Sequence, residues 1–160
     1  MLSARLIQRI ENNWEAIAAN VIGQVRRDQE VSHYQSLSES EIRERAHDLV
    51  VNLSYWLLSN NSAEIGSRYE ALGRRRYREG VPLHEVVYKL AMIRRSIATY
   101  VMEQNLALSA VEVYEELDLV RSLTRFFDLV VHNVVRGYEW EMKESLRNGS
   151  AHAFRVAAAG

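Results

Sequence analysis

Residues 109–148 have the sequence SAVEVYEELDLVRSLTRFFDLVVHNVVRGYEWEMKESLRN, and this stretch decides the fold of the 160-residue chain. It contains no proline and one internal glycine, Gly137. Its apolar residues recur at alternating steps of three and four, which predicts one amphipathic helix with a period close to a heptad. The apolar stripe comprises Val113, Leu117, Val120, Phe127, Val131, Val134 and Tyr138.

Both ends of this helix carry capping signals. Ser109 and Glu112 have the spacing of a capping box, and Gly149 is a natural left-handed stop. The helix spans about 55 Å at ~1.5 Å per residue, which exceeds the width of a small domain. We therefore expect residues 1–148 to form one helical sensory or regulatory domain from which the end of the helix protrudes, and residues 149–160 to form a flexible tail.

The composition is that of a globular protein with one sizeable core. Apolar residues make up 48% of the chain and aromatic residues 9%. A single proline favours long helices over a turn-rich β fold. The 20 basic and 21 acidic residues leave a net charge of −1, so the overall charge does not attract the chain to nucleic acid or anionic lipid.

The chain contains no cysteine. This excludes disulfides, thiolate metal sites and thiol catalysis, and it suits a reducing cytoplasm. Arg5 and Arg9 lie within an amphipathic N-terminus that does not have the pattern of a signal peptide. No apolar run approaches the ~20 residues of a membrane span. We expect a cytoplasmic protein.

Four shorter helices are expected before the long one. They cover residues 3–27, 38–58, 62–80 and 82–103. Ser38 with Glu41 forms a second capping-box pair, and Pro82 suits a first helical position. Long helices with short connectors and one apolar stripe each predict an all-α fold: a five-helix, globin-like bundle with a long C-terminal helix.

Two segments carry a family pattern. Residues 34–42 (YQSLSESEI) and 73–88 (GRRRYREGVPLHEVVY), together with Trp14, resemble the N-terminal domain of RsbRD-type proteins. These proteins are co-antagonists in the bacterial general-stress switch, and similar domains precede some sensor histidine kinases. The resemblance covers residues 6–127. Its Arg-x-x-Gly-Val-x-Leu element is supplied by Arg76, Arg78, Gly80, Val81, Pro82 and Leu83.

The resemblance implies a bacterial, globin-related sensory or scaffolding domain that is often a dimer and usually lacks haem. It also implies that the final helix passes a signal to a C-terminal anti-sigma-antagonist or kinase module. We expect the chain either to act alone or to be one part of a longer protein. A second copy or a helix-linked output domain is expected to cover the protruding helix.

Two groups of residues are candidate contact sites. We expect the interface of a homodimer on the long helix, at Val120, Phe127, Val131, Val134 and Tyr138. A second candidate is a basic cluster that could contact an anion or an acidic partner, or could be a solvated helix end with one arginine paired inward to a carboxylate. This cluster consists of Arg74, Arg75, Arg76 and Arg78.

The histidines support two alternative functions. A haem-binding globin-type sensor would need His84 or His47 as a ligand, although neither has a clearly apolar setting. A histidine phosphotransfer protein would use His132, although the following Arg136 and Gly137 are displaced by one residue from the usual spacing. No nucleophile–base pair or metal-ligand set stands out. We therefore expect a non-catalytic domain with no cofactor and no metal.

Overall fold

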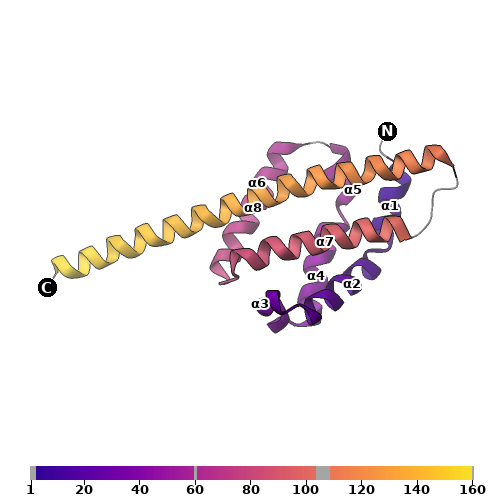
Figure 1. Ribbon diagram of the computed structural model, residues 1–160. Helices are drawn as coiled ribbons and strands as arrows, with labels where there is room; N and C mark the ends of the chain where they lie inside the picture. Colours follow the sequence, from indigo (N-terminus) through magenta and orange to yellow (C-terminus); the bar gives the residue numbers. More distant parts are fainter. Residues whose placement is uncertain (1–2, 60, 104–108, 160) are drawn as a thin grey trace.

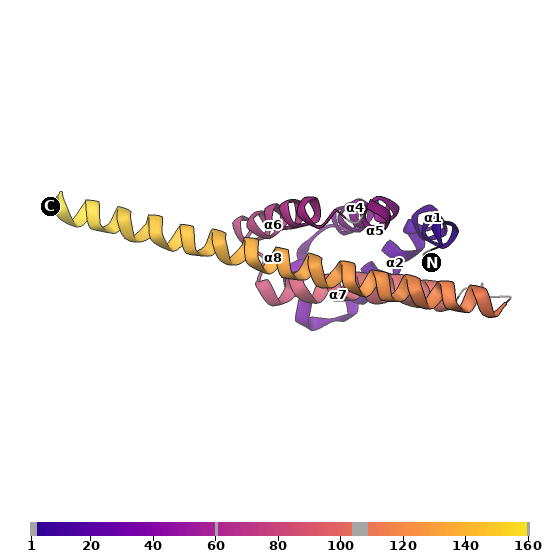
Figure 2. The same ribbon diagram turned by 90° about the horizontal axis from the view of Figure 1, so that it is seen from above.

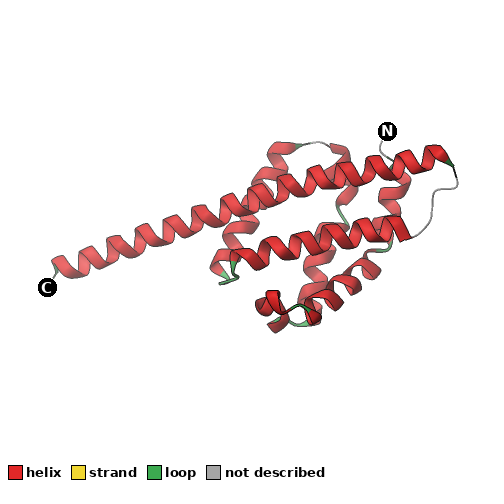
Figure 3. Cartoon of the chain, in the orientation of Figure 1, coloured by secondary structure: helices red, strands yellow, loops and turns green. Residues whose placement is uncertain are grey.

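The chain folds into helices alone in the computed structural model, which describes residues 3–59, 61–103 and 109–159. Within these ranges there are eight α-helices, one 3-10 helix and no strand (Figure 3). The elements are α1 (Ala4–Asn12), α2 (Trp14–Arg27), η1 (Gln29–Val31), α3 (Ser32–Ser36), α4 (Glu39–Val50), α5 (Leu53–Ser59), α6 (Ser62–Arg78), α7 (Leu83–Glu103) and α8 (Ala110–Ala158). The expected all-α bundle with a long C-terminal helix is confirmed.

Helix α8 is the longest element and organises the bundle. It runs beside α7 and crosses α6, and its C-terminal part stands clear of every other helix in two perpendicular views (Figures 1 and 2). The core is filled by fully buried side chains, and the largest of them come from seven helices, including α8 itself. They are Tyr34, Phe127, Ile7, Ile10, Ile17, Ile42, Leu53, Met92, Ile93, Ile97, Leu119 and Leu123.

The expected first and second helices are each broken in two by an asparagine. The side-chain amide of Asn13 donates to the Arg9 carbonyl (2.8 Å), and that of Asn52 donates to the Asp48 carbonyl (3.2 Å). Each amide occupies a carbonyl four residues back, which offers the backbone an alternative to continuing the helix. The prediction of five helices was therefore too low, although the capping box at Ser38 is confirmed.

The prediction that the long helix stops at Gly149 is wrong, because α8 continues to Ala158. Among the described glycines, only Gly80 has a positive φ, of 72°. The residues after Gly149 include Ala151, Ala153 and Ala157, and alanine has the highest helix propensity, which favours continuation of the helix. The division between a domain and a flexible tail remains a prediction. Within the described residues, no helix combines the length and the apolar character needed to cross a membrane.

The left-handed conformation at Gly80 ends α6 and redirects the chain into α7. The Gly80 amide donates to the Tyr77 carbonyl (2.9 Å), and the Val81 amide donates to the Arg76 carbonyl (3.0 Å). These two bonds form a Schellman motif. The turn places Val81 in the core with no exposed surface.

Candidate functional site

Helices α6 and α8 cross with their backbones in direct contact at two glycines. A Cβ atom on Gly73 would lie 2.0 Å from the Val134 carbonyl oxygen, and one on Gly137 would lie 2.0 Å from the Glu70 carbonyl oxygen. Both separations are far below van der Waals contact, so only glycine fits at either position. This pair of approaches, which we call the glycine crossing, fixes the position of α6 on α8.

Two members of the basic cluster lie on the α8 side of α6. The Arg78 guanidinium donates to both carboxylate oxygens of Glu141 (2.9 and 3.1 Å), and it lowers the pKa of that carboxyl group. The Arg74 guanidinium lies 4.0 Å from the Trp140 ring centroid, which is cation–π geometry. These arginines therefore connect α6 to the stretch of α8 just beyond the glycine crossing.

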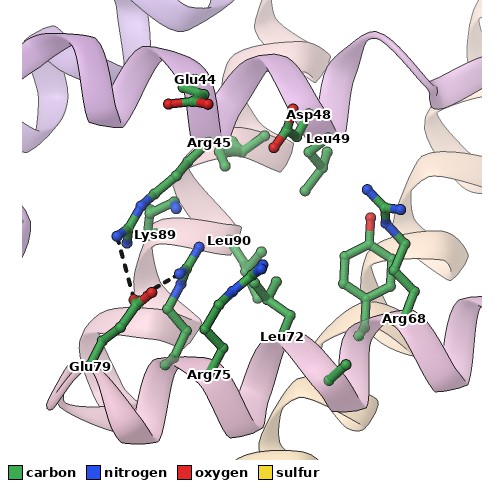
Figure 4. A pocket seen from close by; sticks show the side chains of 14 residues that line it. Glu44, Arg45, Asp48, Leu49, Arg68, Leu72, Arg75, Glu79, Lys89 and Leu90 are labelled. Carbon is green, nitrogen blue, oxygen red and sulfur yellow. Dashed lines mark hydrogen bonds and ion pairs between the residues drawn. The ribbon is translucent and has the colours of Figure 1, made fainter.

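The other two arginines of the cluster point the opposite way, because residues 74 and 78 share one helix face whereas 75 and 76 lie on another. Arg75 and Arg76 line a cavity of about 520 Å³ bounded by α4, α6 and α7 (Figure 4). Arg76 is buried and pairs with Glu79 (2.8 Å). One inward pairing of this kind was expected from the sequence, whereas the division of the cluster between two faces was not.

One end of this cavity brings two arginines and a lysine together near one carboxylate. Arg45 and Arg76 both approach the same oxygen, Glu79 Oε2, at 3.4 and 2.8 Å. Lys89 is only 6% exposed and forms no hydrogen bond or ion pair within the described residues. Its ammonium lies 4.8 Å from the Tyr34 ring centroid. In Figure 4, Lys89 lies beside the contact between Arg45 and Glu79.

The ammonium of Lys89 is poorly compensated in this position. Burial lowers its pKa well below the usual 10.5, and the nearby charges of Arg76 and Arg45 lower the pKa further. A cation–π contact stabilises by about 0.5–2 kcal/mol, whereas removing an ammonium from water costs several kcal/mol. The Tyr34 ring alone therefore does not offset the burial of this charge.

A buried carboxylate holds Tyr34 in place. Glu85, on α7, accepts hydrogen bonds from the Ser32 hydroxyl (3.2 Å) and from the backbone amides of His33 (2.9 Å) and Tyr34 (3.4 Å). These donors begin the short helix α3, whose first amides have no partner within the helix. Glu85 thus fixes the aromatic ring against which Lys89 lies.

Neither Lys89 nor Arg45 was singled out from the sequence. The sequence could have pointed to Lys89 by its position, because it lies between Val86 and Leu90 on the buried side of α7. A lysine there must either extend to solvent or be buried, and the sequence alone does not decide between these outcomes. Arg45 gave no signal, because it becomes part of the site only when α4 packs near α6.

The predicted dimer interface needs correction at two positions. Phe127 and Val134 are buried in the core of the single chain, at 2% and 0% exposure, so they have no surface to offer a second copy. Tyr138 donates to the Val81 carbonyl (2.7 Å) and is partly buried. Val120 and Val131 are also partly buried. The dimer itself stays a prediction.

A second, apolar groove lies between α7 and α8. It has a volume of about 380 Å³ and includes Val87, Leu90, Ala91 and Val131 in its lining. Val87, Ala91 and Val131 are only partly buried. The groove therefore leaves apolar surface at the α7–α8 seam of the single chain.

The candidate histidines are separated in the structure. His47 packs edge-on against Trp14 with 4.4 Å between ring centroids, and His84 is exposed in the first turn of α7. His132 is exposed on α8. Gly137, the glycine that follows it in the phosphotransfer hypothesis, belongs to the glycine crossing. Among the described residues, no group of three or more histidine, aspartate or glutamate side chains is arranged to hold a metal ion.

The family of the chain follows from a comparison with family models. The model of the RsbT co-antagonist protein rsbRD N-terminal domain matches residues 15–153, which is most of the chain and includes all of α6, α7 and the glycine crossing. Searches of curated proteins and of solved structures each gave no match. The chain therefore belongs to the RsbRD N-terminal domain family of stress-signalling co-antagonists.

Proposed function

We propose that this chain is a non-catalytic signalling domain of the bacterial cytoplasm that senses a ligand or partner and relays it through α8. The receiver is a kinase or an anti-sigma-antagonist module, and the domain works as a homodimer. Membership of a regulatory family supports the non-catalytic role and the class of receiver. No step of this proposal requires a metal or a haem group.

The observation that carries the proposal is the two-sided arrangement of α6. One face of α6 holds α8 through Gly73, Arg74 and Arg78. The other face supplies Arg75 and Arg76 to the polar cavity. Packed helices move as units, so a change at the cavity face displaces the face that holds α8. α8 then carries the displacement into its protruding C-terminal part.

The homodimer is proposed to form along the α7–α8 seam rather than through the core positions of α8. Exposed or partly exposed apolar side chains support this choice. On α8 they include Val113 and Leu117, which are 46% and 47% exposed, and Val120 and Val131. Burial of an apolar stripe between two copies is the ordinary basis of helical dimers.

Introducing a charge at this seam is expected to separate the dimer. The substitution Val131→Glu places a carboxylate on the groove lining, where burial in an interface costs several kcal/mol. Sedimentation equilibrium should show a dimer for the wild-type chain and a monomer for the variant. Circular dichroism should be unchanged, because Val131 is not part of the fully buried core.

A matched control is Leu58→Glu, which adds the same charge at an exposed apolar position of α5 that does not line the groove. This control should remain dimeric. A wild-type chain that sediments as a monomer at every concentration would refute the homodimer. Loss of the dimer in both variants would place the interface elsewhere.

A further inference from the structure

The cavity between α4, α6 and α7 has more positive than negative charge. Its lining includes five cationic side chains and three carboxylates. The cations are Arg45, Arg68, Arg75, Arg76 and Lys89, and the carboxylates are Glu44, Asp48 and Glu79. At the end that holds Glu79 the imbalance is sharper, because two arginines share the single oxygen Glu79 Oε2.

Two cationic groups in this cavity have donors without acceptors. Lys89 is more than nine-tenths buried, and neither a hydrogen bond nor an ion pair engages it within the described residues. Arg45 Nη1 is buried and has no hydrogen-bond partner. Buried donors are normally paired, so the unpartnered Arg45 Nη1 close to the unpaired Lys89 favours an acceptor group in this cavity.

Apolar side chains lie among the charged residues of the lining. They are Leu49, Leu72, Leu90 and Ile93. A volume of about 520 Å³ lies within the usual range for small-molecule sites, which combine apolar walls with a few convergent polar groups. The chemistry of the lining therefore fits an occupant with one anionic group and a small apolar body.

We propose that this cavity binds a small organic anion, whose carboxylate or phosphate oxygens are held by Lys89, Arg45 and Arg76 and whose apolar part lies against the leucines. This inference rests on the proposed function, because the anion would be the input that α6 relays to α8. An anionic group would also favour the charged form of Lys89, whose pKa is lowered by burial and by the two arginines.

The chain offers a direct probe of the site because Lys89 and Lys143 are its only lysines. Protein labelled with ¹³C at the lysine Cε gives two signals, and Lys89→Met identifies the signal of the buried lysine. Benzoate and phenyl phosphate are the probes, since they share a ring and differ in the anionic group. Benzamide is the neutral isostere of benzoate. Each is titrated to about 10 mM, because ligands this small bind weakly.

We expect one or both anions to shift the Lys89 signal saturably while the Lys143 signal stays in place. The preferred anion distinguishes a carboxylate ligand from a phosphate ligand, and benzamide should produce no saturable shift. Calorimetry should show affinity at least tenfold weaker in Lys89→Met and in Arg45→Met. Arg43→Met, an exposed arginine of α4 that is absent from the cavity lining, should bind as the wild type does.

Three outcomes would overturn the anion site: no saturable shift with either anion, equal binding of benzamide and benzoate, or unchanged binding in Lys89→Met and Arg45→Met. Each concerns binding alone. If these tests fail but α8 still responds to changes on α6, the anion site is rejected and the relay through α6 is retained. If the anion binds but α8 does not respond, the relay is rejected and the anion site is retained.

Discussion

Replacing Gly73 by alanine is expected to destabilise the protein by at least about 3 kcal/mol, which lowers the midpoint of thermal unfolding by roughly 10 °C in a chain of this size. The added Cβ would lie 2.0 Å from the Val134 carbonyl oxygen. The added Cβ would meet helix backbone rather than a flexible side chain, so no side-chain movement can relieve the clash. The helices must separate, and the packing around the crossing is lost with them. Gly137→Ala is expected to have a similar effect, because its Cβ meets the Glu70 carbonyl oxygen at 2.0 Å.

Gly149→Ala is the matched control for both substitutions. Gly149 also lies in α8, but a Cβ there meets nothing within 4 Å. The alanine should therefore leave stability unchanged or raise it by up to about 1 kcal/mol through helix propensity. Urea unfolding followed by circular dichroism measures all three variants. A Gly73→Ala protein as stable as the wild type would show that α6 and α8 do not touch as described.

Replacing Lys89 by methionine is expected to stabilise the protein by about 1–4 kcal/mol at neutral pH, the opposite sign from most core substitutions. Methionine keeps the length of the side chain and removes a buried ammonium that has no acceptor. Sites that bind ligands commonly retain such unfavourable groups at the expense of stability. The exposed lysine on α8 provides the control, since Lys143→Met should change stability by less than about 0.5 kcal/mol.

The gain from Lys89→Met should depend on pH. The pKa of Lys89 is lowered in the folded state, so between that value and 10.5 the unfolded chain binds more protons. Wild-type stability therefore rises with pH across this window. The advantage of the variant is full below the folded-state pKa and disappears as pH approaches 10.5. Charged groups facing Lys89 are Arg45 on α4 and Arg76 with Glu79 at the end of α6.

The ring beside Lys89 does not titrate in the same window, because burial raises the pKa of Tyr34 to about 12. Urea unfolding of the variant and the wild type at several pH values from 6 to 9.5 gives the difference directly. A Lys89→Met protein that is less stable than the wild type at neutral pH would contradict an uncompensated charge in this cavity.

The helical class and the long final helix were predictable because they depend on local periodicity. The same periodicity did not reveal the breaks at Asn13 and Asn52, where a side-chain amide competes for a carbonyl one turn back. It also placed Phe127 and Val134 in a dimer interface. An apolar stripe shows that a face is buried, but whether the cover is the same chain or a second copy depends on the tertiary arrangement.

The candidate site was predictable only in part, since it is assembled from three helices. The basic cluster on α6 was visible as a run of arginines, but its division into Arg74 and Arg78 on one face and Arg75 and Arg76 on another was not predicted. The importance of Gly73 and Gly137 was not visible. Each glycine is explained by a backbone that lies about 60 residues away in the chain, and single-chain periodicity carries no such information.

If α6 couples the polar cavity to α8, amide hydrogen exchange in an Arg76→Met variant should reveal the coupling in α8. This substitution acts on the cavity face of α6, because Arg76 lines the cavity and pairs with Glu79. Ile17→Val in α2 serves as the control, since it lowers global stability by about 1 kcal/mol without touching the cavity.

We predict that Arg76→Met changes the hydrogen-exchange protection of α8 around residues 134–142 by more than the uniform change seen in Ile17→Val, as expected for a local rather than a global opening. The affected amides should be those nearest the glycine crossing and the Arg78–Glu141 pair. If protection changes at residues 75–79 of α6 while residues 134–142 of α8 match the control, α6 does not couple the cavity to α8, and the proposed relay is contradicted.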